Sequence, residues 1–389
     1  MKVTAIETYV CHCYRANWVF VRVLTDEGLY GIGEATLEMR EPTAVAAVHE
    51  LERHVLGRDP HDIEAIWHEC YRDSYWRGGA VQMTALSGIE MALWDIKGKA
   101  LGVPVWQLLG GMCRDRVPCY ANGWFSPAKT PAEFAAKARI AVRQGFRGLK
   151  WDPFGKAYRT IEKAELRAAI DCVAAVAAEV GPEVNLLIEG HGRFDVPTAL
   201  RIARELEAFD ISWFEEPIMP DHPEGMAEVV RRSNVPIAGG ERLYSRWDAR
   251  TYLEQGCADI LQPDVSHVGG IGELKKIAAM TETYSRVVCP HNPIGPVANA
   301  ATLHLAACVP NFWLLETMNT DVPWRGDVTT EAVRFAAGEM LIPTAPGLGL
   351  DLNLEAIAEH PYERRNLRHY IGTLTEIRPP DAVPWMKEA

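Results

Sequence analysis

Three short stretches of this sequence decide its fold: Leu186-Leu-Ile-Glu189, Trp213-Phe-Glu-Glu-Pro217 and Ile237-Ala-Gly-Gly-Glu241. In each of them an apolar run of strand length leads into a glutamate. The steps from 189 to 215 and from 215 to 241 both span 26 residues, enough for one strand, one helix and two loops. The spacing therefore predicts that Glu189, Glu215 and Glu241 lie at the carboxyl ends of neighbouring parallel strands, on one rim of a barrel.

The same alternation of apolar runs and amphipathic helices continues on both sides of these stretches. Eight runs follow one another, at residues 117–120, 148–150, 185–188, 211–214, 236–238, 259–261, 286–289 and 312–315. Alternation of this kind builds a parallel sheet, and eight units predict an α/β fold with a closed barrel. A doubly wound open sheet is the alternative. It is disfavoured because no G-x-G-x-x-G follows the first strand, and Gly269-Gly-Ile-Gly272 is better explained as a tight turn.

The first 116 residues have a different character. Trp18–Leu24 alternates like a strand, Thr25–Gly28 is a turn signal, and the pattern from 43 to 110 is helical. Strands first and helices second predict a separate α+β domain at residues 1–116. Within the barrel region, Thr130-Pro-Ala-Glu133 predicts a helix that starts with a capping box.

The three strand-end glutamates predict a metal site. Converging carboxylates without cations repel one another, so they must either take up protons or share a metal ion. Oxygen ligands at three positions suit a hard ion that keeps open coordination sites, and they indicate one Mg²⁺ per subunit. The alternative is that one or two of these residues form structural ion pairs or cap helices.

The strand-end rhythm continues with groups that move protons. Asp264 follows Glu241 by 23 residues, His291 follows Asp264 by 27, and Glu316 follows His291 by 25. A carboxylate on an adjacent strand can orient an imidazole and raise its basicity. Asp264 and His291 are therefore predicted to form an acid/base dyad.

A second histidine lies close to the first metal ligand. His191 comes two residues after Glu189 in a glycine-rich loop, and it is predicted to face the same opening as His291. Two imidazoles on different strands suit an elimination, in which one group takes a proton and the other protonates a leaving hydroxyl. We interpret the other ten of the 12 histidines, His267 among them, as structural.

The bulk composition limits the partners. The chain has 389 residues and a net charge of −12, with lysines and arginines scattered singly, which argues against nucleic acid and anionic membranes as partners. A small anionic substrate is compatible with this charge because a bound metal makes a local positive site. The nine cysteines follow no disulfide framework and the first residues do not form a signal peptide, so we expect a cytoplasmic protein with reduced thiols. Cys11-His12-Cys13 is expected to be a strand, with the sulfurs on one face and the imidazole on the other.

Four motifs relate the chain to a known family. Trp213-Phe-Glu-Glu-Pro217, Gly239-Gly-Glu-Arg242, Ile260-Leu-Gln-Pro-Asp264 and Thr84-Ala-Leu-Ser-Gly-Ile-Glu-Met-Ala-Leu-Trp-Asp95 resemble the mandelate racemase subgroup of the enolase superfamily. The resemblance extends over essentially the whole chain. It implies a modified (β/α)₇β TIM-type barrel at 117–344 with one Mg²⁺, an α+β capping domain at 1–116, and a C-terminal segment at 345–389 that returns to the cap.

Within this subgroup the chain is most similar to sugar-acid dehydratases of the gluconate and galactonate types. Residues 120–124, 149–155 and 188–194 resemble the gluconate type, and 266–270 the galactonate type. The resemblance implies Mg²⁺-dependent dehydration of an acid sugar to a 2-keto-3-deoxy acid by a dimer-based homo-oligomer, often an octamer. Gluconate, galactonate, a pentonate and an aldarate all stay open as the substrate, and the choice among them is expected to depend on the cap loops at 14–18 and 38–42.

The resemblance also assigns roles to single residues. It makes Glu189, Glu215 and Glu241 the metal ligands, His291 with Asp264 the base, His191 the general acid, Glu316 a hydrogen-bond donor to the substrate carboxylate, and Lys150 a charge partner of that carboxylate. The candidates for further substrate contacts are Asp152, Arg193, Asn122 and Trp18.

Asp152 marks a departure from the racemases of this subgroup. Those proteins carry Lys-x-Lys at the second strand end, whereas the segment here is Lys150-Trp-Asp152. The loss of the second lysine disfavours two-base racemisation, and Asp152 is expected either to contact a substrate hydroxyl or to pair with Lys150. An epimerase or cycloisomerase acting through the same enediolate is the alternative function. A metal-binding protein without activity is a third.

Overall fold

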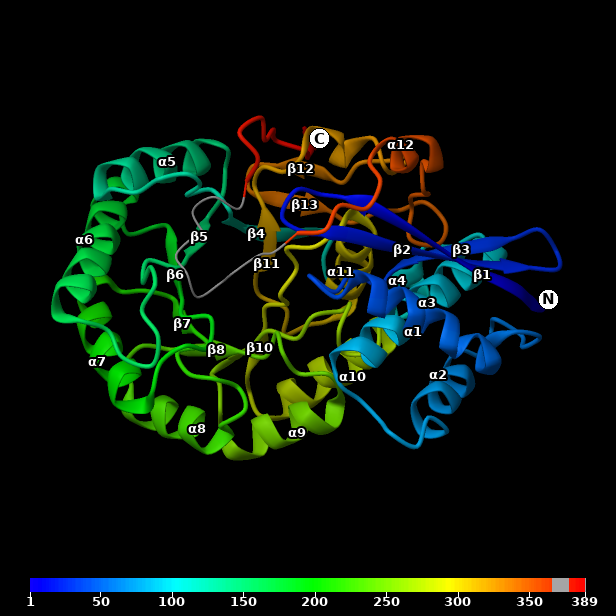
Figure 1. The fold of residues 1–389 in the computed structure, drawn as a ribbon, viewed down its shortest axis with the longest axis horizontal. Coiled ribbons are helices and arrows are strands. Elements are labelled where there is room, and N and C mark those ends of the chain that lie inside the picture. Colours follow the sequence, from blue (N-terminus) through cyan, green and yellow to red (C-terminus); the bar gives the residue numbers. More distant parts are fainter. Residues whose placement is uncertain (366–377, 389) are drawn as a thin grey trace.

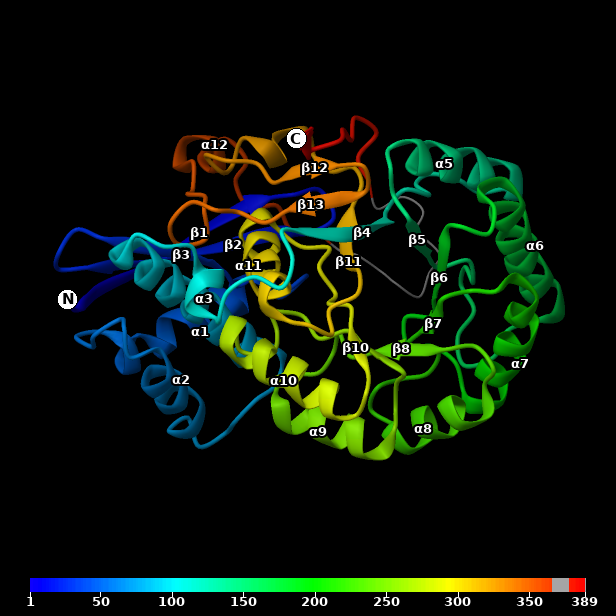
Figure 2. The same cartoon turned by 180° about the vertical axis from the view of Figure 1, so that it is seen from behind.

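The computed structural model describes residues 1–365 and 378–388, so that 366–377 and 389 of the predicted C-terminal segment lie outside the described residues. It shows a ring of strands surrounded by helices, with a smaller domain packed against one side (Figures 1 and 2). Within the described residues, no helix combines the length and apolar character needed to span a bilayer.

The smaller domain is α+β, as predicted. Its elements are β1 (Val3–His12), β2 (Asn17–Thr25), β3 (Tyr30–Glu34), α1 (Glu41–Val55), α2 (Ile63–Arg72), α3 (Ala80–Leu101) and α4 (Val105–Leu108). The three strands form an antiparallel sheet in sequence order, and α3 packs against β3. Alternate residues of β2, namely Val19, Val21 and Val23, are fully buried in the core that the sheet shares with the helices.

The barrel alternates strands and helices along the chain. Its elements are β4 (Arg116–Asn122), α5 (Pro131–Arg143), β5 (Gly148–Trp151), α6 (Lys163–Val180), β6 (Asn185–Glu189), α7 (Val196–Leu206), β7 (Trp213–Glu215), α8 (Pro223–Arg232), β8 (Ile237–Gly239), α9 (Arg246–Gln255), β9 (Ile260–Leu261), α10 (Ile271–Thr283), β10 (Val287–Val288), α11 (Pro296–Cys308) and β11 (Leu315–Met318). A short 3₁₀ turn, η1 (Glu207–Phe209), follows α7.

The strands of the barrel are parallel and close into a ring. Each strand from β4 to β9 pairs with the next one along the chain, and β11 pairs with β4. The ring closes where Phe312, just before β11, bridges in parallel to Val288 of β10. Eight strands with seven intervening helices confirm the predicted (β/α)₇β barrel. The predicted capping box is also present, because Thr130 Oγ1 accepts the N–H of Glu133 at 3.3 Å and the Glu133 side chain accepts the N–H of Thr130 at 3.0 Å.

The barrel interior forms a floor beneath the strand ends. Leu187, Trp213 and Leu314 belong to one buried cluster and lie two residues before Glu189, Glu215 and Glu316 respectively. Because side chains of a strand alternate with a period of two, these apolar residues share a face with the glutamates and lie one layer below them. The glutamates therefore project into the opening above an apolar layer of side chains.

The chain leaves the barrel after β11 and returns to the capping domain. The elements of this part are η2 (Pro323–Gly326), β12 (Arg334–Ala336), β13 (Glu339–Leu341), α12 (Leu354–Glu359) and β14 (Lys387–Glu388). β13 pairs antiparallel with β4. Further along, the N–H of Leu348 donates to Asp95 of α3 at 2.8 Å, and Tyr30 of β3 donates to Asp351 at 2.6 Å. These contacts attach the returning segment to the cap.

Candidate active site

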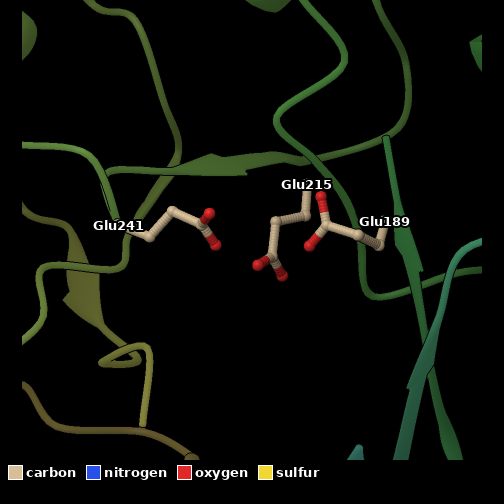
Figure 3. Close-up of side chains that lie close together, drawn as sticks. All are labelled: Glu189, Glu215 and Glu241. Atoms are coloured by element: carbon tan, nitrogen blue, oxygen red, sulfur yellow. The ribbon is translucent and has the colours of Figure 1, made fainter. Parts of the chain in front are cut away.

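Three glutamates converge at the carboxyl ends of β6, β7 and β8. Glu189 ends β6, Glu215 ends β7, and Glu241 follows β8 by two residues. The parallel register places Glu189 opposite Glu215. One carboxylate oxygen from each of the three lies within 4.8 Å of the others, which is close enough to share a metal ion (Figure 3). The 26-residue spacing thus brings three carboxylates to one point on the rim.

A buried lysine partly offsets the charge of these glutamates. Lys150, on β5, places its Nζ 2.8 Å from Glu215 Oε1, 2.8 Å from Glu316 Oε1 and 3.6 Å from Glu189 Oε2. Burial alone would lower the pKa of Lys150, but the carboxylates, Glu215 foremost, raise it well above its ordinary value. The ammonium group is therefore a permanent positive charge beside the cluster.

The glutamate cluster has room for a further positive charge. Burial and the neighbouring Glu215 raise the pKa of Glu189 well above its ordinary value. Its Oε2 atom is buried and makes no hydrogen bond within the described part of the chain. A proton would satisfy this oxygen, and a metal ion would do so too. The donor set consists of carboxylate oxygens alone, which fits Mg²⁺.

His291 and Asp264 form a hydrogen-bonded pair on one side of the cluster. His291 follows β10, and its Nδ1 lies 2.7 Å from Oδ2 of Asp264, which follows β9. The other oxygen of Asp264 accepts the N–H of Ser266 at 2.7 Å, and His291 Nε2 lies 3.6 Å from Glu241. Burial lowers the pKa of His291, but Glu241 and Asp264 outweigh it and raise the pKa to about 10. If a cation bound Glu241 and neutralised its charge, the contact with Asp264 would still orient the ring of His291.

His191 and Asp152 form a second pair on the other side. His191 Nδ1 lies 2.7 Å from Asp152 Oδ2, and Arg193 Nη2 contacts both oxygens of Asp152 at 2.6 and 2.7 Å. Burial raises the pKa of Asp152, but Arg193 and His191 outweigh it, and the net effect is a lowered pKa. Of the two alternatives for Asp152, pairing with Lys150 is therefore wrong, and contact with a substrate hydroxyl stays a prediction. Lys150 is turned toward glutamates, while Asp152 joins His191 to Arg193.

Glu316 supports Lys150 from the last strand of the barrel. Its Oε1 accepts from Lys150 Nζ at 2.8 Å and from Asn122 Nδ2 at 2.7 Å, and its Oε2 accepts the N–H of Asn292 at 3.2 Å. Each of these contacts uses Glu316 as an acceptor, whereas the resemblance implies a donor. In this geometry Glu316 holds Lys150 and Asn122 in place.

A cavity of about 270 Å³ lies over these groups. Its wall includes Asn122, Lys150, Asp152, Glu189, His191, Glu241 and His291 from the barrel, and Arg15, Leu37, Glu38 and Met39 from the capping domain. Ligand pockets usually measure roughly 300–1,000 Å³, so this cavity suits a small molecule. Both domains are needed to enclose it.

Two of the proposed substrate contacts lie away from the cavity wall. Trp18, on β2, is 2% exposed and packs in the core, where the guanidinium of Arg325 lies 5.4 Å from its ring centre. The alternation of β2 turns this side chain inward. Arg193 is 1% exposed and lies behind Asp152. A direct substrate contact by Trp18 or Arg193 therefore has no support in the structure.

Several residues of the wall were not predicted as site residues, among them Arg15, Arg242 and His267. Arg242 and His267 lie one and three residues after predicted strand-end carboxylates, so their positions held a usable signal. His267 was instead interpreted as structural. Arg15 comes from the loop between β1 and β2 and pairs with Glu38 at 2.7 Å. Both residues lie in the capping-domain loops at 14–18 and 38–42, on which the choice of substrate was expected to depend, and the packing of the two domains brings them to the cavity.

The fold and the site define a class of protein, namely a capped (β/α)₇β barrel whose strand ends present three carboxylates and two imidazoles to one cavity. The chain belongs to the mandelate racemase/muconate lactonizing enzyme family of the enolase superfamily. Residues 2–110 match the N-terminal domain of that family, and residues 133–357 match its enolase C-terminal domain-like part.

Known proteins similar to this chain agree with the family. The chain is 39% identical to the D-gluconate dehydratase of Thermoproteus tenax over 354 residues, which cover 90% of this chain and 71% of the relative. It is 38% identical to the D-galactonate dehydratase of Ralstonia pickettii (strain 12J) over 387 residues, which cover 97% and 100% respectively. Among solved structures, a member of the enolase superfamily from Salmonella Typhimurium matches with a TM-score of 0.89 at 32% identity, covering 92% of this chain and 98% of the other.

Proposed function

We propose that this protein is a Mg²⁺-dependent sugar-acid dehydratase, a hydro-lyase that converts an aldonate to a 2-keto-3-deoxy acid. The observation that carries the proposal is a pair of imidazoles on opposite sides of one carboxylate cluster. His191 follows the third strand of the barrel and His291 follows the seventh, and strands four apart in a ring of eight face each other. Each imidazole has a carboxylate 2.7 Å from Nδ1, so Nε2 is the atom that each would use.

The cluster supplies the positive charge that a substrate carboxylate needs. Glu189, Glu215 and Glu241 would hold Mg²⁺, which supplies the charge that stabilises an enediolate. The ammonium of Lys150 would donate to a carboxylate oxygen of the substrate. Glu316 keeps that ammonium in place through its 2.8 Å contact.

The proposed reaction then proceeds through two proton transfers on opposite sides of the substrate. His291 removes the C2 proton, and the electron pair of the broken C–H bond forms the C1–C2 double bond of the enediolate. The enediolate electrons then form a C2–C3 double bond as the C3–oxygen bond breaks. His191 protonates the departing hydroxyl, which leaves as water. The remaining enol takes up a proton at C3 and loses one from its oxygen, which yields the keto acid.

The substrate class follows from the relatives. Two that are similar along most of this chain are named after D-gluconate and D-galactonate, which supports an aldonate. The competing function, an epimerase or cycloisomerase, would begin with the same removal of the C2 proton and would form no keto acid. Assembly into a dimer-based homo-oligomer stays a prediction from the resemblance.

A substrate panel tests the proposed function. The purified protein is incubated with Mg²⁺ and a set of aldonic and aldaric acids, and 2-keto acid is measured as its semicarbazone. We expect keto acid from one or two aldonates, and no signal after treatment with EDTA or in the Glu241→Gln variant. Exchange of the C2 proton for deuterium without keto acid would instead identify an epimerase. Neither exchange nor keto acid with any substrate of the panel would count against the proposal.

A further inference from the structure

The motif at residues 84–95 has no part in the proposed chemistry, although it is one of the four motifs that relate the chain to its family. Residues 84–95 lie on α3 of the capping domain. Three of its polar side chains, Thr84, Ser87 and Glu90, follow one another at steps of three residues and are 0%, 0% and 2% exposed. This spacing puts them in a row on one face of the helix. We name the three residues the α3 clamp.

Each member of the α3 clamp contacts the segment that runs from the end of β9 to the first turn of α10. Thr84 Oγ1 lies 2.8 Å from Nδ1 of His267, and Ser87 Oγ accepts the N–H of Gly269 at 2.9 Å. The two oxygens of Glu90 accept the N–H groups of residues 271 and 272 at 2.7 and 2.8 Å. These two donors belong to the first turn of α10, whose N–H groups have no partner within the helix. Figure 2 shows α3 beside α10.

The loop is shaped to fit the clamp. Gly269 and Gly270 have φ values of +104° and +98°, which side-chain-bearing residues rarely adopt. A Cβ atom at Gly270 would overlap the carboxylate of Glu90, and one at Gly269 would come within 2.9 Å of Trp67 Nε1. The indole of Trp67 also donates to the carbonyl of Gly269 at 2.8 Å. The two glycines therefore allow the capping domain to approach the loop backbone.

The same loop carries one residue of the cavity wall, His267, and the carboxylate that orients another, His291. Asp264, at its start, holds Nδ1 of His291, and His267 lies on the cavity wall 3.9 Å from Asp264. We propose that the α3 clamp positions the base of the reaction, because it fixes the loop through which Asp264 orients His291. Thr84, Ser87 and Glu90 are then positioning residues supplied by the capping domain. The consequence for the base rests on the proposed function, whereas the hold on the loop does not.

A matched residue on the same helix allows a controlled test. Asp95 is buried like Glu90 and also accepts two backbone N–H groups, those of Ile32 at 2.9 Å and Leu348 at 2.8 Å. These donors lie outside the loop that begins at Asp264. We compare Glu90→Gln with Asp95→Asn in the full-length protein. Each change removes the charge and turns one acceptor oxygen into an NH₂ group that faces an N–H donor.

Hydrogen–deuterium exchange reports on the loop without any substrate. We expect Glu90→Gln to raise amide exchange in residues 264–272 by roughly tenfold or more, and Asp95→Asn to leave it unchanged. Ser87→Ala removes one hydrogen bond to the loop, together with the one that Ser87 donates to the carbonyl of Met83, and it is the second variant if Glu90→Gln does not fold. We expect it to raise exchange in the same residues by roughly fivefold. Unchanged exchange in both clamp variants, or an equal rise in Asp95→Asn, would overturn the inference.

Kinetics then tests the consequence for the base. We expect Glu90→Gln to lower kcat by roughly 10- to 10²-fold with little change in KM, because a small displacement of a catalytic group slows the step that it performs. The primary isotope effect of a C2-deuterated substrate should increase, while Asp95→Asn should leave it unchanged. A clamp that only stabilised the fold would lower thermal stability in both variants and move the isotope effect in neither. Wild-type protein inactive on every sugar acid would refute the proposed function alone, since the exchange experiment still decides whether the clamp holds the loop.

Discussion

The two imidazoles of the cavity are held alike but surrounded differently. His291 and His191 each place Nδ1 2.7 Å from a carboxylate, that of Asp264 and that of Asp152 respectively. On the side of His291, the second oxygen of Asp264 accepts the backbone N–H of Ser266. On the side of His191, Arg193 contacts both oxygens of Asp152. An arginine therefore contacts the carboxylate beside His191, whereas a backbone N–H contacts the one beside His291.

This difference suits opposite directions of proton transfer. A base gains from a neighbouring negative charge when it takes up a proton, and Asp264 offers that charge to His291. A general acid has to release its proton, which a fully available carboxylate would oppose. Arg193 is always charged and shares the carboxylate beside His191. His267 also lies near Asp264, at 3.9 Å, but an imidazole is not a permanent cation.

The two sides also differ in what supports them. Arg193 donates to the carbonyls of Gly155 and Gly190 at 2.8 and 3.0 Å, so the acid side is tied together by barrel loops. The loop on the base side is contacted by Ser87 and Glu90 of the capping domain. The comparison therefore predicts that substitutions on the two sides separate the two proton transfers.

The largest effect is expected from His291→Asn. Without the base, both C2 deuterium exchange and keto acid formation should fall by on the order of 10³-fold or more, because every later step depends on loss of the C2 proton. Both rates are measured on the same substrate, with circular dichroism to confirm folding. Exchange that survived in this variant would place the base on the other side of the cavity and reverse the comparison.

His191→Asn is expected to have the next largest effect, and on one step only. Keto acid formation should fall by roughly 10²- to 10³-fold, since the hydroxyl would have to leave without a proton. C2 deuterium exchange should continue, because His291 and Asp264 are intact. The ratio of exchange to dehydration is the measured quantity, and an unchanged ratio would mean that His191 takes part in both transfers.

Asp152 and Asp264 orient the two imidazoles, and substituting them should separate the two proton transfers in the same way but with smaller effects. Groups that orient a catalytic residue typically contribute about 10- to 100-fold. We expect Asp152→Asn to lower dehydration by that factor and to leave exchange largely intact, whereas Asp264→Asn should lower both. The two variants are matched controls for each other, since each removes one buried charge next to an imidazole. Equal loss of exchange in both would show that Asp152 has no separate role.

The positions of the strand ends could be predicted from the sequence, because spacing along the chain is enough to place them. Parallel strands all run in the same direction, so equal steps along the chain put their last residues on the same rim. For this reason the fold brings together Glu189, Glu215 and Glu241. It also places Asp264 within hydrogen-bond distance of His291. Each of the eight apolar runs overlaps a strand of the barrel. The runs are apolar because the strands of a parallel sheet are buried on both faces.

Contacts between distant segments could not be predicted in this way. Lys150 was one of two expected partners of Asp152, but Asp152 contacts His191 and Arg193 instead, because the choice among nearby cations depends on which rotamers the packing allows. Arg15 and Glu38 pair within the capping domain, and the packing of that domain against the barrel places them on the cavity wall. Likewise, the antiparallel pairing of β13 with β4 has no signal in the periodicity of either strand.

The smallest expected effect is on the free energy of unfolding, and it again distinguishes the side of the cavity that carries His291. Burial raises the pKa of Glu90 from 4.5 to about 7, although the N–H groups that it caps, Trp94 and Lys276 lower it. Between these two values the folded state binds more protons than the unfolded one, so the free energy of unfolding falls as the pH rises. Each unit of difference corresponds to about 1.4 kcal/mol. On the acid side, Asp152 has a lowered pKa and contributes no such loss in this range.

Glu90→Gln should remove this contribution. Urea unfolding is measured at about pH 5 and about pH 8 and at one fixed protein concentration, because oligomers unfold in a concentration-dependent manner. We expect the difference in unfolding free energy between the two pH values to be smaller in Glu90→Gln than in wild-type protein. Ser87→Ala keeps the carboxyl and should keep the full difference. An unchanged difference in Glu90→Gln would assign the pH dependence to another buried carboxyl with a raised pKa, such as Glu34. The hold of the capping domain on the base-side loop would then be independent of pH over this range.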